Sequence, residues 1–225
     1  MPRCAVNEFF KTVEVQRWDD HRFYHHSRIN QSLHLLSAVC FLVAYALLFV
    51  EPAWAAVLAW CVSMTSRQAG HFFFEPRGFD HVNNVTDAYK EDIKIGYNIR
   101  RKIVLMAVWV LIPGALLLHP TLFGLIQPAE GVAGYIHDVG TAWLALGVGG
   151  LLFRMGQLLI QQGPIASLAW GYKIVTDPFH DIKMYHRAPL YLLRGELIDP
   201  MTHVQEHLAQ EEEGSEGEEL APRAP

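Results

Sequence analysis

Two stretches of the chain carry polar residues at four-residue intervals, namely His26, Asn30 and His34 in one and Arg67, His71 and Glu75 in the other. Residues four apart share one face of an α-helix. Imidazole binds iron, zinc and copper, and two histidines with a carboxylate form a ligand set that leaves positions open on non-haem iron. His34 and His71 are therefore candidate metal ligands. Glu75 is expected either to bind the same metal or to orient a histidine that does.

Both stretches lie in segments that are apolar enough to cross a membrane. A crossing helix needs about 20 mostly apolar residues. Four segments with at most one charged residue each meet this requirement, at 29–50, 53–74, 103–126 and 139–160. Only Glu51 and Pro52 separate the first two, which predicts a tight helical hairpin. The expected fold is all-α, an integral membrane four-helix bundle of two hairpins, in a single domain of residues 1–205.

Lysine and arginine fall on one side of these spans. They precede the first span, lie between the second and third, and follow the fourth, whereas residues 51–52 and 118–140 contain none. Cytoplasmic loops carry such an excess, so both termini are expected in the cytoplasm, at the inner membrane of a bacterium or the endoplasmic reticulum of a eukaryote. His34 and His71 then lie at similar depth, and ionisable groups within spans are functional candidates.

Composition narrows the remaining possibilities. The chain of 225 residues is 51% hydrophobic and 18% charged, with a net charge of −5, which excludes a nucleic-acid binder built on a basic face. Seven acidic residues from Glu206 onward predict a disordered acidic tail, 206–225. The mixed segment 173–197, which Pro178 and Pro189 divide, predicts cytoplasmic interfacial helices.

The two motifs resemble those of a known family, the 2-hydroxy fatty acid dioxygenases, which are small membrane proteins. The resemblance rests on Tyr24-His25, Asn30 and His34 for the first motif and on Gly70-His71-Phe72-Phe73-Phe74-Glu75 for the second. It covers residues 23–76, around a helical hairpin as in the family. The chain departs from the family at Gln68, which is one residue closer to the Gly-His pair, and in the residues after Glu75.

The resemblance implies an iron(II)-dependent enzyme that uses O2 to shorten 2-hydroxy fatty acids by one carbon. It implies His25, His34 and His71 as metal-site residues. Fe2+ is then the expected cofactor, and a long-chain 2-hydroxy fatty acid, O2 and the lipid bilayer are the expected partners. Arg67 is the candidate for binding the substrate carboxylate, because arginine makes bidentate contacts with carboxylates; Arg28 and Arg77 are alternatives.

Further site residues are expected around this centre. His180, with Asp177 or Asp181, could complete the metal site from the C-terminal segment. Glu75, Arg67 and Asn30 are the expected catalytic residues beside the metal. His26, His81 and His186 are weaker candidates.

Three other functions remain open at this point. Two facing histidines in a helical bundle can ligate a haem for electron transfer. A di-iron hydroxylase or desaturase would be similarly rich in histidine, but its paired-histidine boxes are absent here. A non-catalytic membrane scaffold, with the acidic tail binding a partner, predicts no bound metal. The sequence leaves the oligomeric state open.

Overall fold

The computed structural model describes residues 2–75, 77–95, 99–127 and 130–219, and this part of the chain is helical apart from turns and two isolated β-bridges. The elements in chain order are α1 (Pro2–Tyr24), α2 (Arg28–Leu47), α3 (Pro52–Leu58), the π-helical η1 (Ala59–Met64), α4 (Thr65–Phe73), α5 (Asp87–Ile93), α6 (Ile99–Leu118), α7 (Gly131–Gln162), α8 (Pro164–Tyr185), α9 (Ala188–Leu193) and α10 (Thr202–Glu219). The predicted all-α class is confirmed for the described residues.

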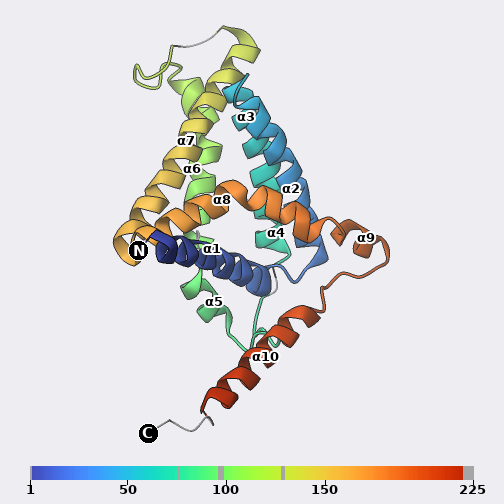
Figure 1. Cartoon of the computed structure of the whole chain (residues 1–225). Helices are drawn as coiled ribbons and strands as arrows, with labels where there is room; N and C mark the ends of the chain where they lie inside the picture. The colour runs from blue at the N-terminus through green and yellow to red at the C-terminus, as the bar shows by residue number, and fades with distance from the viewer. Residues whose placement is uncertain (1, 76, 96–98, 128–129, 220–225) are drawn as a thin grey trace.

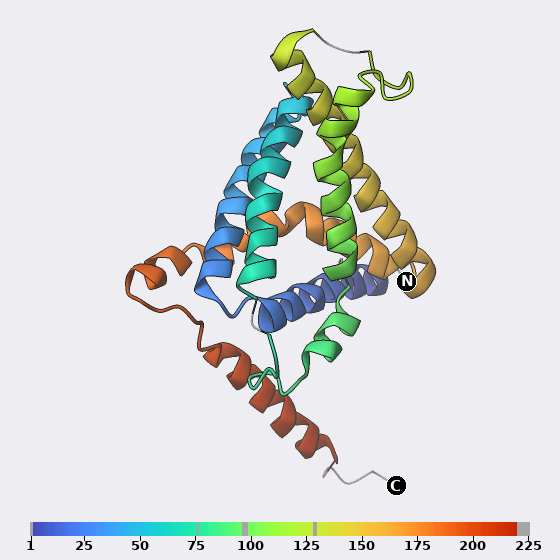
Figure 2. The same ribbon diagram turned by 180° about the vertical axis from the view of Figure 1, so that it is seen from behind.

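Three helices of the described chain are long and apolar enough to cross a membrane: α2, residues 100–118 of α6, and α7. α2 forms a hairpin with α3, η1 and α4, which follow one another without a break, and α6 forms a second hairpin with α7 (Figure 1). The two hairpins approach each other at the end that carries their turns and spread apart toward the opposite end (Figure 2). There α1 and α8 lie across the opening between them.

Tryptophans hold the hairpins together where they converge. Trp60 and Trp143 are buried, and the ring of Trp109 lies against both of them. The indole N–H of Trp60 donates to the carbonyl of Trp143 at 2.9 Å. Pro113 has no N–H, so it leaves the carbonyl of Trp109 without its helical donor, and the indole N–H of Trp143 donates to that carbonyl at 3.0 Å. Both buried donors are thereby satisfied, as burial of an indole requires.

Three helix ends differ from the predicted spans. α2 stops at Leu47 instead of residue 50, α6 stops at Leu118 instead of 126, and α7 begins at Gly131 instead of 139. α6 ends where it does because Pro120 disfavours a helical conformation in the residue before it. α7 begins earlier because a helix can continue past the apolar segment from which a span is predicted.

One prediction for the C-terminal part was wrong. Pro178 does not divide the interfacial segment, because α8 runs through it and packs against α1, α2 and α7; this packing offsets the lost backbone hydrogen bond. Pro189 does mark a boundary, as it lies in the first turn of α9. α10 extends from Thr202 into the acidic segment as far as Glu219, and the disorder predicted for 206–225 stays a prediction. Residues 220–225 lie outside the described residues.

Candidate metal centre

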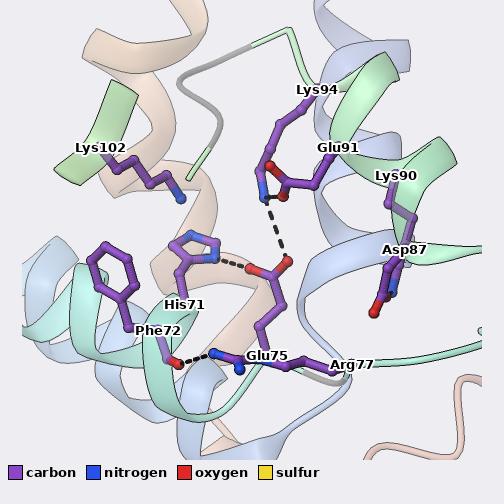
Figure 3. Close-up of a pocket in the computed structure, with 9 residues that line it drawn as sticks. All are labelled: His71, Phe72, Glu75, Arg77, Asp87, Lys90, Glu91, Lys94 and Lys102. Carbon is purple, nitrogen blue, oxygen red and sulfur yellow. Dashed lines mark hydrogen bonds and ion pairs between the residues drawn. The ribbon is translucent and has the colours of Figure 1, made fainter. Parts of the chain in front are cut away.

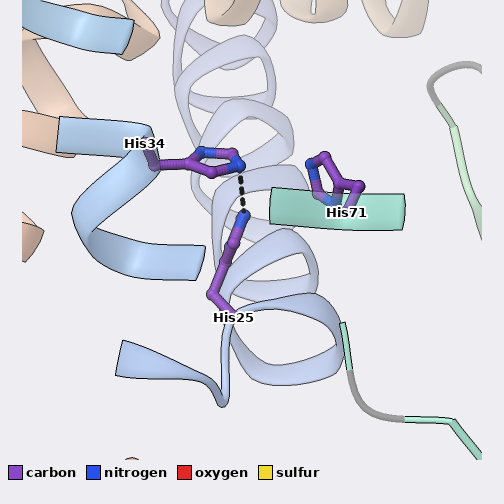
Figure 4. Close-up of side chains that lie close together, drawn as sticks. All are labelled: His25, His34 and His71. Carbon is purple, nitrogen blue, oxygen red and sulfur yellow. Dashed lines mark hydrogen bonds between the residues drawn. The ribbon is translucent and has the colours of Figure 1, made fainter. Parts of the chain in front are cut away.

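Three histidines from three different segments converge at the open end of the first hairpin. His25 lies in the short link between α1 and α2, His34 lies in the second turn of α2, and His71 lies near the end of α4. One ligand nitrogen from each lies within 4.8 Å of the other two, and the Nε2 atoms of His25 and His34 are 3.2 Å apart (Figure 4). His25 and His34 are buried and His71 is nearly so. This histidine trio could bind a metal ion.

The ring nitrogens of the trio are in a state that suits metal binding. Among the described residues, the buried Nδ1 atoms of His25 and His34 have no hydrogen-bond partner, although a carboxylate oxygen of Asp181 lies 3.5 Å from Nδ1 of His34. Burial, followed by the neighbouring His34, holds the pKa of His25 well below its usual range, so that this imidazole is neutral. Neutral imidazole is the form that binds metals. The ring centroids are only 4.3 to 5.4 Å apart, so a single ion can contact all three rings.

Two carboxylates lie behind the trio. Glu75 Oε2 is 2.8 Å from Nδ1 of His71, and Asp181 Oδ2 is 3.5 Å from Nδ1 of His34. A carboxylate that is hydrogen-bonded to a metal-binding histidine, as Glu75 is, fixes the orientation and tautomer of that histidine. The structure therefore places Glu75 behind His71, leaving Nε2 of His71 for a ligand.

Arg67 contacts a different group from the one predicted. Its guanidinium forms an ion pair with Asp181, the same carboxylate that approaches His34. Arg67, Asp181 and His34 thus form one chain of contacts between α4, α8 and α2. The role predicted for Arg67 in binding a substrate carboxylate stays a prediction, and in the described arrangement the charge of Arg67 is compensated by Asp181.

Asn30 and Gly70 set the distance between the two helices that carry His34 and His71. The Asn30 side chain donates to the carbonyl of Tyr24 at 2.8 Å, and its Oδ1 faces Gly70. A Cβ atom on Gly70 would lie 2.1 Å from that oxygen. The Gly-His sequence thus has a packing reason, because only glycine lets α4 approach α2 this closely.

Replacing Gly70 with alanine should separate these helices. The new methyl group overlaps Asn30, and overpacking of this kind costs about 1–3 kcal/mol. We expect a lower melting temperature in detergent and weaker metal binding. Asn30→Ala should be milder alone, and combining it with Gly70→Ala should restore part of the stability because the smaller side chain makes room for the methyl group. Unchanged stability and metal content in Gly70→Ala would contradict this account of the helix crossing.

The other predicted site residues lie apart from the trio. His180 is half-buried on α8 and does not belong to the one such metal-ligating group found among the described residues. Asp177 is paired with Lys173 at 2.7 Å and Arg17 at 3.3 Å. The remaining three histidines have other contacts, His26 with the carbonyl of Arg22, His81 with the ring of Phe79, and His186 with the carbonyl of Lys183.

Sequence reasoning missed Tyr185. Its buried ring lies 5.5 Å from the ring of His25 and 6.2 Å from that of His34, between centroids. Its hydroxyl is 3.1 Å from Nδ1 of His21, whose Nε2 is 2.8 Å from Nε2 of His203. Burial, followed by the neighbouring His203, lowers the pKa of His21 to about 4. The four-residue spacing from Asp181 was the available signal.

A cavity of about 160 Å³ opens beside the trio. It is lined by His71, Phe72 and seven charged side chains, four basic and three acidic (Figure 3). Burial raises the pKa of the Glu75 carboxyl, although Lys94 opposes this effect. The trio therefore borders a small polar space.

Comparisons with protein-family models, with curated proteins and with solved structures found no match to this chain.

Proposed function

We propose that this protein is a membrane-embedded, iron(II)-dependent dioxygenase that shortens long-chain 2-hydroxy fatty acids by one carbon. The observation that carries the proposal is the convergence of His25, His34 and His71, with ligand nitrogens within 4.8 Å of one another. These three histidines are also the ones that the resemblance to the 2-hydroxy fatty acid dioxygenases implies as metal-site residues.

The position of the trio suits a lipid substrate. His34 lies near the start of α2, which is apolar and long enough to cross a membrane, and His71 lies near the end of α4, so both lie at the same end of the first hairpin. We take α3, η1 and α4 as the fourth crossing of a membrane bundle and place both termini in the cytoplasm, from the distribution of Lys and Arg. A fatty acid would then keep its tail in the bilayer and present its carboxyl end at the depth of the trio.

The chain's own residues would hold and orient the metal. His25, His34 and His71 would bind it, Glu75 would hold the proton on Nδ1 of His71, and the negative charge of Asp181 would lie 3.5 Å from Nδ1 of His34. When bound, iron(II) would supply the Lewis-acid and redox chemistry needed with O2. Atoms and electrons balance if one 2-hydroxy acid and one O2 give the acid one carbon shorter, carbon dioxide and water.

The packing of the rings favours a single ion over a haem. The centroids of His34 and His71 are 4.9 Å apart, and the ring of His25 contacts both. A macrocycle between two axial histidines would need these rings to move apart. Three histidine ligands on one small site also differ from the larger ligand sets of di-iron bundles.

Turnover of a defined substrate tests the proposal. Purified protein loaded with iron(II) should convert 2-hydroxyhexadecanoate to pentadecanoate, consuming one O2 for each acid, and should leave hexadecanoate unchanged. His137→Ala is the matched control, because His137 is exposed and lies far along the chain from the trio on α7; it should keep full activity. Protein that holds iron at the trio and still leaves the 2-hydroxy acid intact would overturn the proposed function.

A further inference from the structure

Four basic and three acidic side chains line the cavity beside His71, so the basic side chains outnumber the carboxylates by one. Lys94 Nζ is 3.4 Å from Glu75 Oε1 and 3.4 Å from Glu91 Oε1. Lys90 Nζ is 3.1 Å from Asp87 Oδ1. Each of the three acidic residues that line the cavity therefore already has a lysine partner.

Two lining cations, Arg77 and Lys102, lie outside these pairs. Arg77 is exposed to solvent and donates to the carbonyl of Phe72 at 3.2 Å, which leaves Lys102 as the less exposed of the two. Lys102 belongs to the first turns of α6 and is half-buried, and within the described parts of the chain it forms no ion pair with a carboxylate. Its side chain points into the cavity and toward the ring of His71 (Figure 3). A partly desolvated ammonium group is stabilised by an anion that enters beside it.

The charge of Arg67 already has a partner. Its guanidinium is paired with Asp181, whereas no such pair must be broken for Lys102 to bind an anion. Lys102 comes from α6 in the second hairpin and His71 from α4 in the first, and both line the cavity.

We propose that Lys102 binds the carboxylate of a long-chain fatty acid and thereby holds the adjacent carbon near the histidine trio; this rests on the proposed function. The volume of about 160 Å³ suits a carboxyl group and the first carbons but not a long chain. The chain would leave past Phe73 and Ile103, which are exposed apolar neighbours of the lining residues Phe72 and Lys102.

Binding without turnover tests the assignment. Iron-loaded protein in detergent would be titrated with hexadecanoate, which lacks the 2-hydroxyl group, and with hexadecanol as the uncharged control. The wild type should prefer the carboxylate. Lys102→Met should weaken hexadecanoate binding about 10- to 100-fold, the range for a lost hydrogen bond to a charged group, and should leave hexadecanol binding unchanged. Lys102→Arg should retain most of the preference.

Arg100→Met provides the matched control. Arg100 is an exposed cation two residues away that lines a different groove, between α6 and α7, so its loss should not alter hexadecanoate binding. Metal content, measured in every variant, checks that the trio is intact.

The outcomes separate this proposal from the proposed function. A Lys102-dependent carboxylate preference in a protein that does not oxygenate 2-hydroxy acids would leave the subsite standing and remove the function. Oxygenation together with full hexadecanoate affinity in Lys102→Met would remove the subsite alone. Tighter Lys102-dependent binding of hexadecyl phosphate than of hexadecanoate would also overturn it, because the site would then select a phosphate headgroup.

Discussion

Replacing His34 or His71 with alanine should remove most of the metal from the purified protein. Each residue supplies one of three ligand nitrogens that lie within 4.8 Å of one another, and His180, the other histidine predicted to bind, lies outside this group. Among the described residues, no fourth histidine belongs to this group to replace the lost ligand. The measurement is metal content per chain by elemental analysis after purification in detergent.

The double variant His34→Ala/His71→Ala should hold little less metal than either single variant, because ligands that act as a unit have non-additive effects. Glu75→Gln should be milder, as its hydrogen bond reaches His71 on Nδ1; losses of such supporting contacts cost about 10–100-fold in affinity or activity. Complete loss of metal in Glu75→Gln would instead identify Glu75 as a ligand. Full metal content and activity in both histidine variants would contradict the assignment of the trio.

The local part of the site could be predicted from sequence because it follows helical spacing. Arg67, His71 and Glu75 are four residues apart, and the structure does place Glu75 against Nδ1 of His71. The turn between Leu47 and Pro52 could be predicted in the same way, since a proline is favoured in the first turn of a helix. Its position folds α4 back along α2, which is what brings His71 beside His34.

Contacts between distant segments could not be predicted in this way. The pairing of Arg67 with Asp181 depends on how α8 crosses the first hairpin, and hydropathy does not determine that angle. Lys102 reaches the cavity only because the second hairpin stands beside the first. His180 and Asp181 are neighbours on α8 and therefore point in different directions, so only one of them could reach His34.

The ion pair between Arg67 and Asp181 should affect both stability and metal binding, and the two effects can be separated. The side chains of Arg67 and Asp181 are 17% and 8% exposed. Asp181→Asn removes the negative charge and leaves a largely buried guanidinium without compensation. Breaking a buried pair from one side typically costs about 3–5 kcal/mol. The same change removes the carboxylate that lies 3.5 Å from His34, so metal affinity should fall about 10–100-fold.

The double variant Arg67→Met/Asp181→Asn distinguishes these causes. Without the arginine no uncompensated charge remains, so the melting temperature in detergent should recover most of the loss seen in Asp181→Asn. Metal affinity should not recover, because His34 still lacks its carboxylate. Asp92→Asn, which removes an exposed carboxylate from α5, should match the wild type in both measurements. If Asp181→Asn is as stable as the wild type and binds metal as tightly, the contact chain from Arg67 through Asp181 to His34 does not support the metal centre.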